Sequence, residues 1–138
     1  MNMKRLTIGS VVGLVALYVL GIVIWEMVFT DFFAANAGPA EGVLRESPVM
    51  WAVVIGSLFY AVLLTLAIEN QSGESSLATG LKIGAVIGVL LWGTTDFVLY
   101  GYQNVNNLTA TIADVVLEGI RGGITGAVIA VVLSKVGN

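Results

Sequence analysis

Long apolar segments alternate with short polar ones along the chain, and this pattern predicts transmembrane helices. Crossing about 30 Å of hydrocarbon takes about 20 mostly apolar residues. Four segments meet this requirement: residues 6–29, 48–68, 77–100 and 112–136. A soluble helical bundle would need a polar face on each helix, and these segments lack one. We therefore expect an all-α, integral membrane four-helix bundle that forms a single transmembrane domain of residues 1–138.

The basic residues predict how the helices are oriented. With four spans both termini lie on one side, together with Lys4, Arg5, Lys82 and Lys135, whereas Arg45 lies on the other side. Lys and Arg are enriched in cytoplasmic loops. The N- and C-termini should therefore be cytoplasmic.

Composition supports a membrane protein and excludes several classes of function. Of the 138 residues, 57% are hydrophobic and 11% are charged, whereas a soluble domain has about 25% charged residues. The net charge of −3 argues against a nucleic-acid partner. The chain has no Cys and no His, which excludes disulfides, thiol or imidazole catalysis and the usual zinc sites. We expect no cofactor, no metal and no enzymatic activity, although a catalytic carboxylate pair is a weaker alternative.

The two halves of the chain resemble each other. Gly21 and Trp25 in the first span correspond to Gly88 and Trp92 in the third, at an offset of about 67 residues. Each half would be a helical hairpin, and two such repeats would be related by an axis near the membrane normal. Chance matching of apolar residues is the alternative. The predicted repeat units are residues 1–70 and 71–138.

Small residues recur at four-residue spacing and predict where helices pack closely. In lipid, such stripes let two backbones approach, and this contact drives association. Packing within one bundle is the simpler interpretation, and contact of one stripe with another subunit is the alternative, giving a homo-oligomer or a membrane-protein partner. The candidate packing residues are Gly13, Gly80, Gly84, Gly88, Gly119, Gly122, Gly123 and Gly126.

Charged residues inside the outer half of the spans are the candidate site. Asp114, Glu118 and Arg121 share one face of the fourth helix, because their spacings are four and three. Arg121 should lie near the midplane, where an unpaired Arg costs about 2.5–3.5 kcal/mol. Glu26 and Asp96 belong to the same leaflet, so these four acids could surround Arg121.

This cluster has two interpretations. Four carboxylates around one guanidinium are over-acidic, so at least one should hold a proton, which is a basis for proton-coupled or cation-binding chemistry. Thr94, Thr95 and Thr125 would assist. The alternative is a structural ion-pair network that joins the four helices.

Aromatic residues gather towards the same side, notably Trp25, Trp92 and Tyr100, with Trp51 and Tyr102. Such residues commonly form the belt at the membrane interface. The alternative is a cavity lined by Trp25, Trp92 and Tyr100 that takes an organic cation or a lipid headgroup.

The motifs W-E, T-T-D-F and D-x-x-x-E-G-I-x-G-G, at Trp25, Thr94 and Asp114 onwards, resemble those of small bacterial inner-membrane proteins filed as domains of unknown function. In that group Asp96 and Asp114 would be the matching acids, whereas Glu118 and Arg121 lie outside its pattern. The resemblance implies the bacterial inner membrane and carries no established activity. The small multidrug transporters are similar in size and helix number, which is a likeness of architecture alone.

Two functions follow from these observations. The first is a small transporter or an ion- or solute-binding membrane protein that uses the charged cluster. The alternative is a non-catalytic structural or accessory subunit of a membrane complex. A lipid-modifying enzyme is a third and weaker possibility. In each case the lipid bilayer is the immediate partner.

Overall fold

The computed structural model describes residues 2–43, 45–71 and 75–136; the other residues of the predicted domain lie outside this description. Within the described ranges all helices and strands of more than one residue are helices. One isolated β-bridge joins Ala37 to Asn106. The elements in chain order are α1 (Met3–Gly21), the π-helix η1 (Ile22–Val28), α2 (Thr30–Ala35), α3 (Met50–Glu69), α4 (Leu77–Tyr102) and α5 (Leu108–Leu133).

Four of these helices are long and apolar enough to cross a membrane, which confirms the expected number. They are α1 continued by η1, then α3, α4 and α5. Their ends differ from the expected ones by up to four residues, most at α5, which begins at Leu108 rather than residue 112. The reason is a helix cap, because the Asn107 side chain accepts a hydrogen bond from the Ala110 amide. The helix therefore begins directly after Asn107, within the polar stretch.

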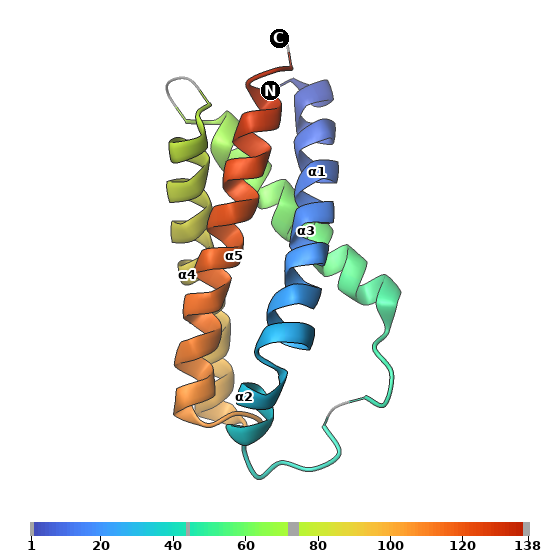
Figure 1. Cartoon of the computed structure of the whole chain (residues 1–138), viewed down its shortest axis with the longest axis vertical. Helices are drawn as coiled ribbons and strands as arrows, with labels where there is room; N and C mark the ends of the chain where they lie inside the picture. The colour runs from blue at the N-terminus through green and yellow to red at the C-terminus, as the bar shows by residue number, and fades with distance from the viewer. Residues whose placement is uncertain (1, 44, 72–74, 137–138) are drawn as a thin grey trace.

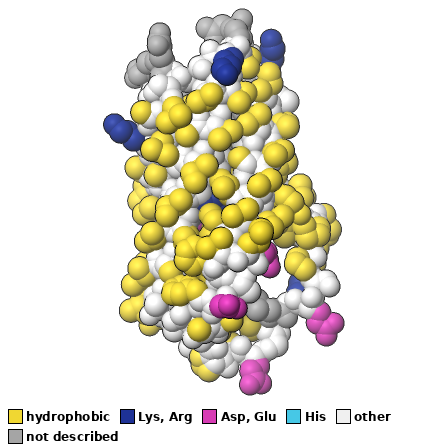
Figure 2. All heavy atoms as spheres, in the orientation of Figure 1, with side chains coloured by type: hydrophobic (Ala, Val, Ile, Leu, Met, Phe, Trp, Pro, Cys, Tyr) yellow, Lys and Arg dark blue, Asp and Glu magenta, His cyan; other side chains and the backbone are white. Residues whose placement is uncertain are grey.

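Both chain ends lie at the same end of the bundle, and we call the opposite end, which carries α2, the distal end (Figure 1). Apolar side chains cover the flank of the molecule, as a lipid-facing surface requires (Figure 2). On this face, basic side chains gather mainly near the terminal end and acidic ones near the distal end. This distribution agrees with the asymmetry on which the predicted orientation rests, and the orientation itself stays a prediction.

Helices α4 and α5 run antiparallel and pack along their whole length through small residues (Figure 1). A Cβ at Gly80, Gly84 or Gly88 would meet the backbone carbonyl of Gly126, Gly122 or Glu118, respectively. Only hydrogen fits at these positions, and the absent side chains allow the two backbones to touch.

The other predicted packing glycines also lie against neighbours in the same chain. A Cβ at Gly119 would meet the Val89 side chain at 2.7 Å, and one at Gly123 would meet Ala85 at 3.4 Å. The two rows of small residues on α5, Gly119 with Gly123 and Gly122 with Gly126, therefore both face α4. On α1, a Cβ at Gly13 would meet Ile129 of α5 at 2.8 Å.

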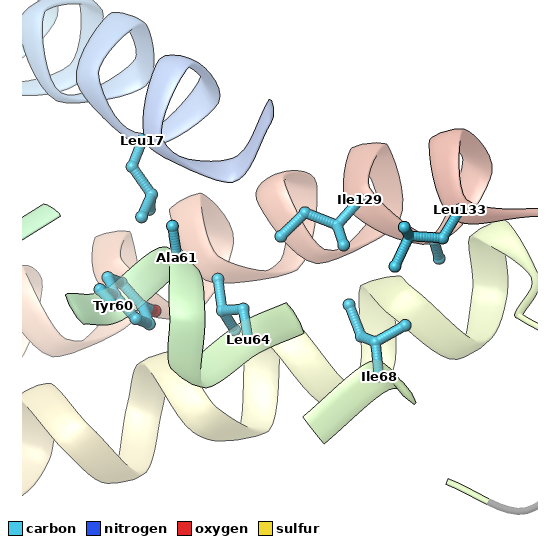
Figure 3. Packing of buried hydrophobic residues seen from close by; sticks show 8 residues of the cluster. Leu17, Tyr60, Ala61, Leu64, Ile68, Ile129 and Leu133 are labelled. Carbon is cyan, nitrogen blue, oxygen red and sulfur yellow. The ribbon is translucent and has the colours of Figure 1, made fainter. Parts of the chain in front are cut away.

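Helix α3 is tilted across the bundle and contributes to the core through its C-terminal half alone (Figure 1). There Tyr60, Ala61, Leu64 and Ile68 pack with other buried residues of α1 and α5 (Figure 3). The N-terminal half of α3 is exposed, with Trp51 70% exposed. Helices α1 and α3 thus contact each other less extensively than α4 and α5 do, and the internal repeat stays a prediction.

At the distal end, two loops far apart in the sequence pair with each other. The Gly38 amide donates to the Val105 carbonyl at 2.7 Å, and the Ala40 amide donates to the Asn104 carbonyl at 3.1 Å. Gly38 lies so close to Asn104 that a Cβ would collide with its backbone. This pairing holds the segment after α2 against the turn between α4 and α5.

At the terminal end, Arg5 connects three helices. Its guanidinium forms a salt bridge to Glu69 of α3 at 2.7 Å and donates to the carbonyls of Leu133 and Val136 at the end of α5. A cation at a helix C-terminus also interacts favourably with the helix dipole. The sequence predicts Arg5 on the cytoplasmic side and contains no signal for this contact.

We expect Arg5→Ala to lower the free energy of unfolding by about 2 kcal/mol, because the substitution leaves Glu69 and two carbonyls without their donor. Unfolding in mixed micelles by added sodium dodecyl sulfate, followed by circular dichroism, measures this change. The matched control is Lys4→Ala, which removes the same charge at an exposed neighbouring position. Equal stability of the two variants would contradict the prediction.

Candidate functional site

Arg121 is the centre of the site and lies at the middle of α5. It follows Leu108, the first residue of the helix, by about 20 Å at the rise of an α-helix. Its Nη1 donates to Glu118 Oε1 at 2.7 Å. Its Nε and Nη2 both donate to the Leu17 carbonyl of α1, at 3.1 and 2.8 Å. Arg121 is therefore paired, as a cation deep in a span should be, and it also joins α5 to α1.

Glu118 is almost completely buried, with 2% of its surface exposed. One carboxylate oxygen pairs with Arg121, whereas Oε2 has no hydrogen-bond partner within the described ranges. The Tyr60 hydroxyl of α3 is also buried without a partner, and it lies close to Gly122. A Tyr inside an apolar run gives no signal of where its hydroxyl lies, so the sequence does not predict the position of Tyr60.

Asp114 is positioned by an aromatic side chain. Its Oδ1 accepts a hydrogen bond from the Trp25 indole Nε1 at 2.6 Å. The face of the same indole lies 5.3 Å from Arg121 Cζ, a cation–π geometry. Trp25, which lies in η1, thus contacts both Asp114 and Arg121.

The remaining predicted acids, Glu26 and Asp96, form no ion pair with Arg121 in the described part of the chain. Asp96 of α4 lies beside Asp114, and its Oδ2 is buried without a partner in the described part of the chain. Glu26 is exposed and forms no ion pair among the described residues. The five charged residues therefore do not form a closed ring of carboxylates around Arg121. Among them, only Glu118 and Arg121 form an ion pair in the described part of the chain.

The threonines expected to assist the acids bond elsewhere. The Thr94 and Thr95 hydroxyls donate to the carbonyls of Leu90 and Leu91 in their own helix. Thr125 is fully buried, and its hydroxyl has no partner in the parts that the structure describes.

A cavity of about 830 Å³ opens in the distal half and reaches Arg121; we call it the distal cavity. Its walls come from the end of α1, η1, α2, the following loop, the turn before α5, α5 itself and Trp92 of α4. Three of the four predicted acids line it. The charged and aromatic lining residues are Trp25, Glu26, Phe33, Trp92, Asp114, Glu118 and Arg121.

Asp96 and Tyr100 do not line the distal cavity. They border a separate, small pocket of about 80 Å³ between α4 and the turn that precedes α5. Tyr100 therefore does not join Trp25 and Trp92 in lining one cavity. Trp51 and Tyr102 are 70% and 88% exposed, as residues of an interfacial belt would be.

Within the described residues no group of three or more acidic side chains is arranged to hold a metal ion. The fold and the cavity define a class: a multi-pass helical protein with four candidate membrane spans and a charged, partly aromatic cavity in its distal half. The chain matches no protein-family model, no curated protein and no solved structure at a significant level.

Proposed function

We propose that this chain is a small transporter or an ion- or solute-binding membrane protein, not an enzyme, and that the distal cavity takes up its solute. The observation that carries the proposal is that the cavity, of about 830 Å³, reaches the Glu118–Arg121 pair at the middle of α5. This volume falls in the range of ligand pockets. Ionisable residues that deep in a span commonly mark substrate or ion pathways.

The backbone around the cavity also supports a functional site. Trp25 and Glu26 line the cavity from η1, a seven-residue π-helix that follows α1. Single π-turns inside helices occur frequently at functional sites, because the wider turn changes the direction of the side chains that follow. Here the wider turn carries the indole that bonds Asp114 and stacks on Arg121.

Topology and origin form part of the proposal. The termini would be cytoplasmic and the distal cavity would open to the outside of a bacterial inner membrane, as the basic residues and the resemblance suggest. Trp25 and Trp92, which occupy corresponding positions of the two proposed repeats, both line the cavity. This shared placement supports a duplication with a site between the halves, in a protein that forms homo-oligomers or binds another membrane protein.

A structural or accessory subunit is the second candidate, and one observation favours it. The N-terminal half of α3 is largely exposed, and its Trp51 and Phe59 are 70% and 71% exposed. A partner helix could cover this surface. This role predicts a stable complex with that partner and no solute movement.

Solute movement in liposomes tests the first candidate against the second. Purified protein is reconstituted into proteoliposomes, and proton or cation flux is followed with an enclosed dye. We expect flux above that of empty liposomes, and an at least tenfold lower rate for Glu118→Gln, which corresponds to about 1.4 kcal/mol. Glu46→Gln, which changes an acid in the loop before α3, is the matched control and should keep the wild-type rate. Background flux from folded wild-type protein would exclude the transporter and leave solute binding, without transport, as the function to test.

A further inference from the structure

We infer that the distal cavity binds an organic ammonium ion that carries an apolar group, and that Glu118 accepts a hydrogen bond from its nitrogen. This inference rests on the proposed function and names the chemical class of the solute. It is carried by the charge of the cavity lining, by an unpartnered carboxylate oxygen, by aromatic walls and by the cavity size.

The lining has an excess of negative charge. Its charged members are Glu26, Asp114, Glu118 and Arg121, that is, three acids and one base. The Arg121 charge is already compensated, because Glu118 and the Leu17 carbonyl accept its hydrogen bonds. A cation entering the cavity therefore meets Glu26 and Asp114, with which no basic side chain of the described residues forms an ion pair.

Glu118 offers a specific acceptor. It lines the cavity, is 2% exposed, and has Oε2 without a hydrogen-bond partner in the described part of the chain. An ionised carboxylate oxygen accepts hydrogen bonds and cannot donate, so the missing partner is a donor. Leaving a buried charged acceptor unpaired is unfavourable. An ammonium N–H group supplies the donor, and Glu26 and Asp114 of the same lining compensate its charge.

The aromatic walls and the volume favour an organic ion over a small inorganic one. Trp25 already has a cation near its face, Arg121 at 5.3 Å, so this environment accepts positive charge. The indole of Trp92 lines the same cavity from α4. Trp faces attract alkylammonium groups. A volume of about 830 Å³ exceeds what a metal ion requires and accommodates an apolar chain or ring.

An ammonium group could come from a free amine or from a lipid headgroup, and the experiment separates the two. The protein is purified in maltoside micelles, which contain no ammonium. Trp51→Phe is used throughout, because Trp51 lies outside the cavity and the remaining tryptophans, Trp25 and Trp92, both line it. Tryptophan fluorescence then reports on the cavity while octylammonium, octanoate or octanol is added.

We expect saturable binding of octylammonium, with octanoate and octanol at least tenfold weaker. Glu118→Gln should weaken octylammonium binding about 10- to 100-fold, as for loss of a hydrogen bond to a charged group. Glu26→Gln provides a second variant that breaks no ion pair among the described residues, and it should weaken binding several-fold. Glu46→Gln should change binding less than twofold.

Added phosphatidylethanolamine that competes with octylammonium would identify a lipid headgroup as the source, whereas equal weak effects of phosphatidylethanolamine and phosphatidylglycerol would identify a free amine. Octanoate binding as tight as octylammonium binding would overturn the inference and leave the proposed function standing. Flux without octylammonium binding would do the same. If folded protein showed no binding and no flux, both the inference and the proposed function would be overturned.

Discussion

Gly84→Ala should separate α4 from α5 and lower the free energy of unfolding by about 3 kcal/mol. The added Cβ would collide with the carbonyl of Gly122 on the facing helix. Backbone cannot move aside as a side chain can, so relief requires the two helices to part along their contact. Overpacking typically costs about 1–3 kcal/mol, and a backbone obstacle belongs at the upper end.

Unfolding by added sodium dodecyl sulfate, followed by circular dichroism, measures this loss. Gly101→Ala is a close control, because it lies in the same helix and a Cβ there would meet no atom within 4 Å. That variant should be as stable as the wild type or slightly more stable, since alanine favours the helix. Equal stability of the two variants would show that α4 and α5 do not pack through their glycines.

Arg121→Met should lower the free energy of unfolding by about 3–5 kcal/mol, the usual cost of breaking a buried ion pair on one side. The substitution preserves much of the side-chain volume but leaves Glu118, which is 2% exposed, without its partner. It also removes both hydrogen bonds to the Leu17 carbonyl, which join α5 to α1.

The double variant Arg121→Met with Glu118→Leu distinguishes the loss of the ion pair from the loss of the hydrogen bonds to Leu17. Replacing both members of a buried pair with apolar residues is often nearly neutral. We therefore expect the double variant to recover most of the stability lost in Arg121→Met, with the same denaturant titration as the measurement. A double variant as unstable as Arg121→Met would show that the contact with Leu17, not the ion pair, provides the stability.

Much of the architecture follows from local patterns. Four long apolar runs predict four spans because the length of a helix and the thickness of a bilayer are matched. Glycine spacing also identified residues that lie where α4 and α5 meet, since a stripe of small residues lies on one side of a helix whatever its neighbour is. The depth of Arg121 follows in the same way from its position in the span.

The site could be predicted less well, because its contacts join residues far apart in the sequence. Helical spacing places Glu118 next to Arg121, as found at 2.7 Å. It cannot show that the Leu17 carbonyl and the Trp25 ring meet the same guanidinium. It also cannot show that Asp96 borders a different pocket.

The sequence by itself determined that the chain has four apolar helices and that Glu26, Asp96, Asp114, Glu118 and Arg121 enter them in one half. These properties depend on residue type and helical period, which are local. The tertiary structure alone decided that α1 continues as a π-helix, that α3 diverges from the bundle, and that a cavity reaches Arg121. The physical reason is that a cavity forms where helices do not meet, and the angle between two helices depends on both packing surfaces together.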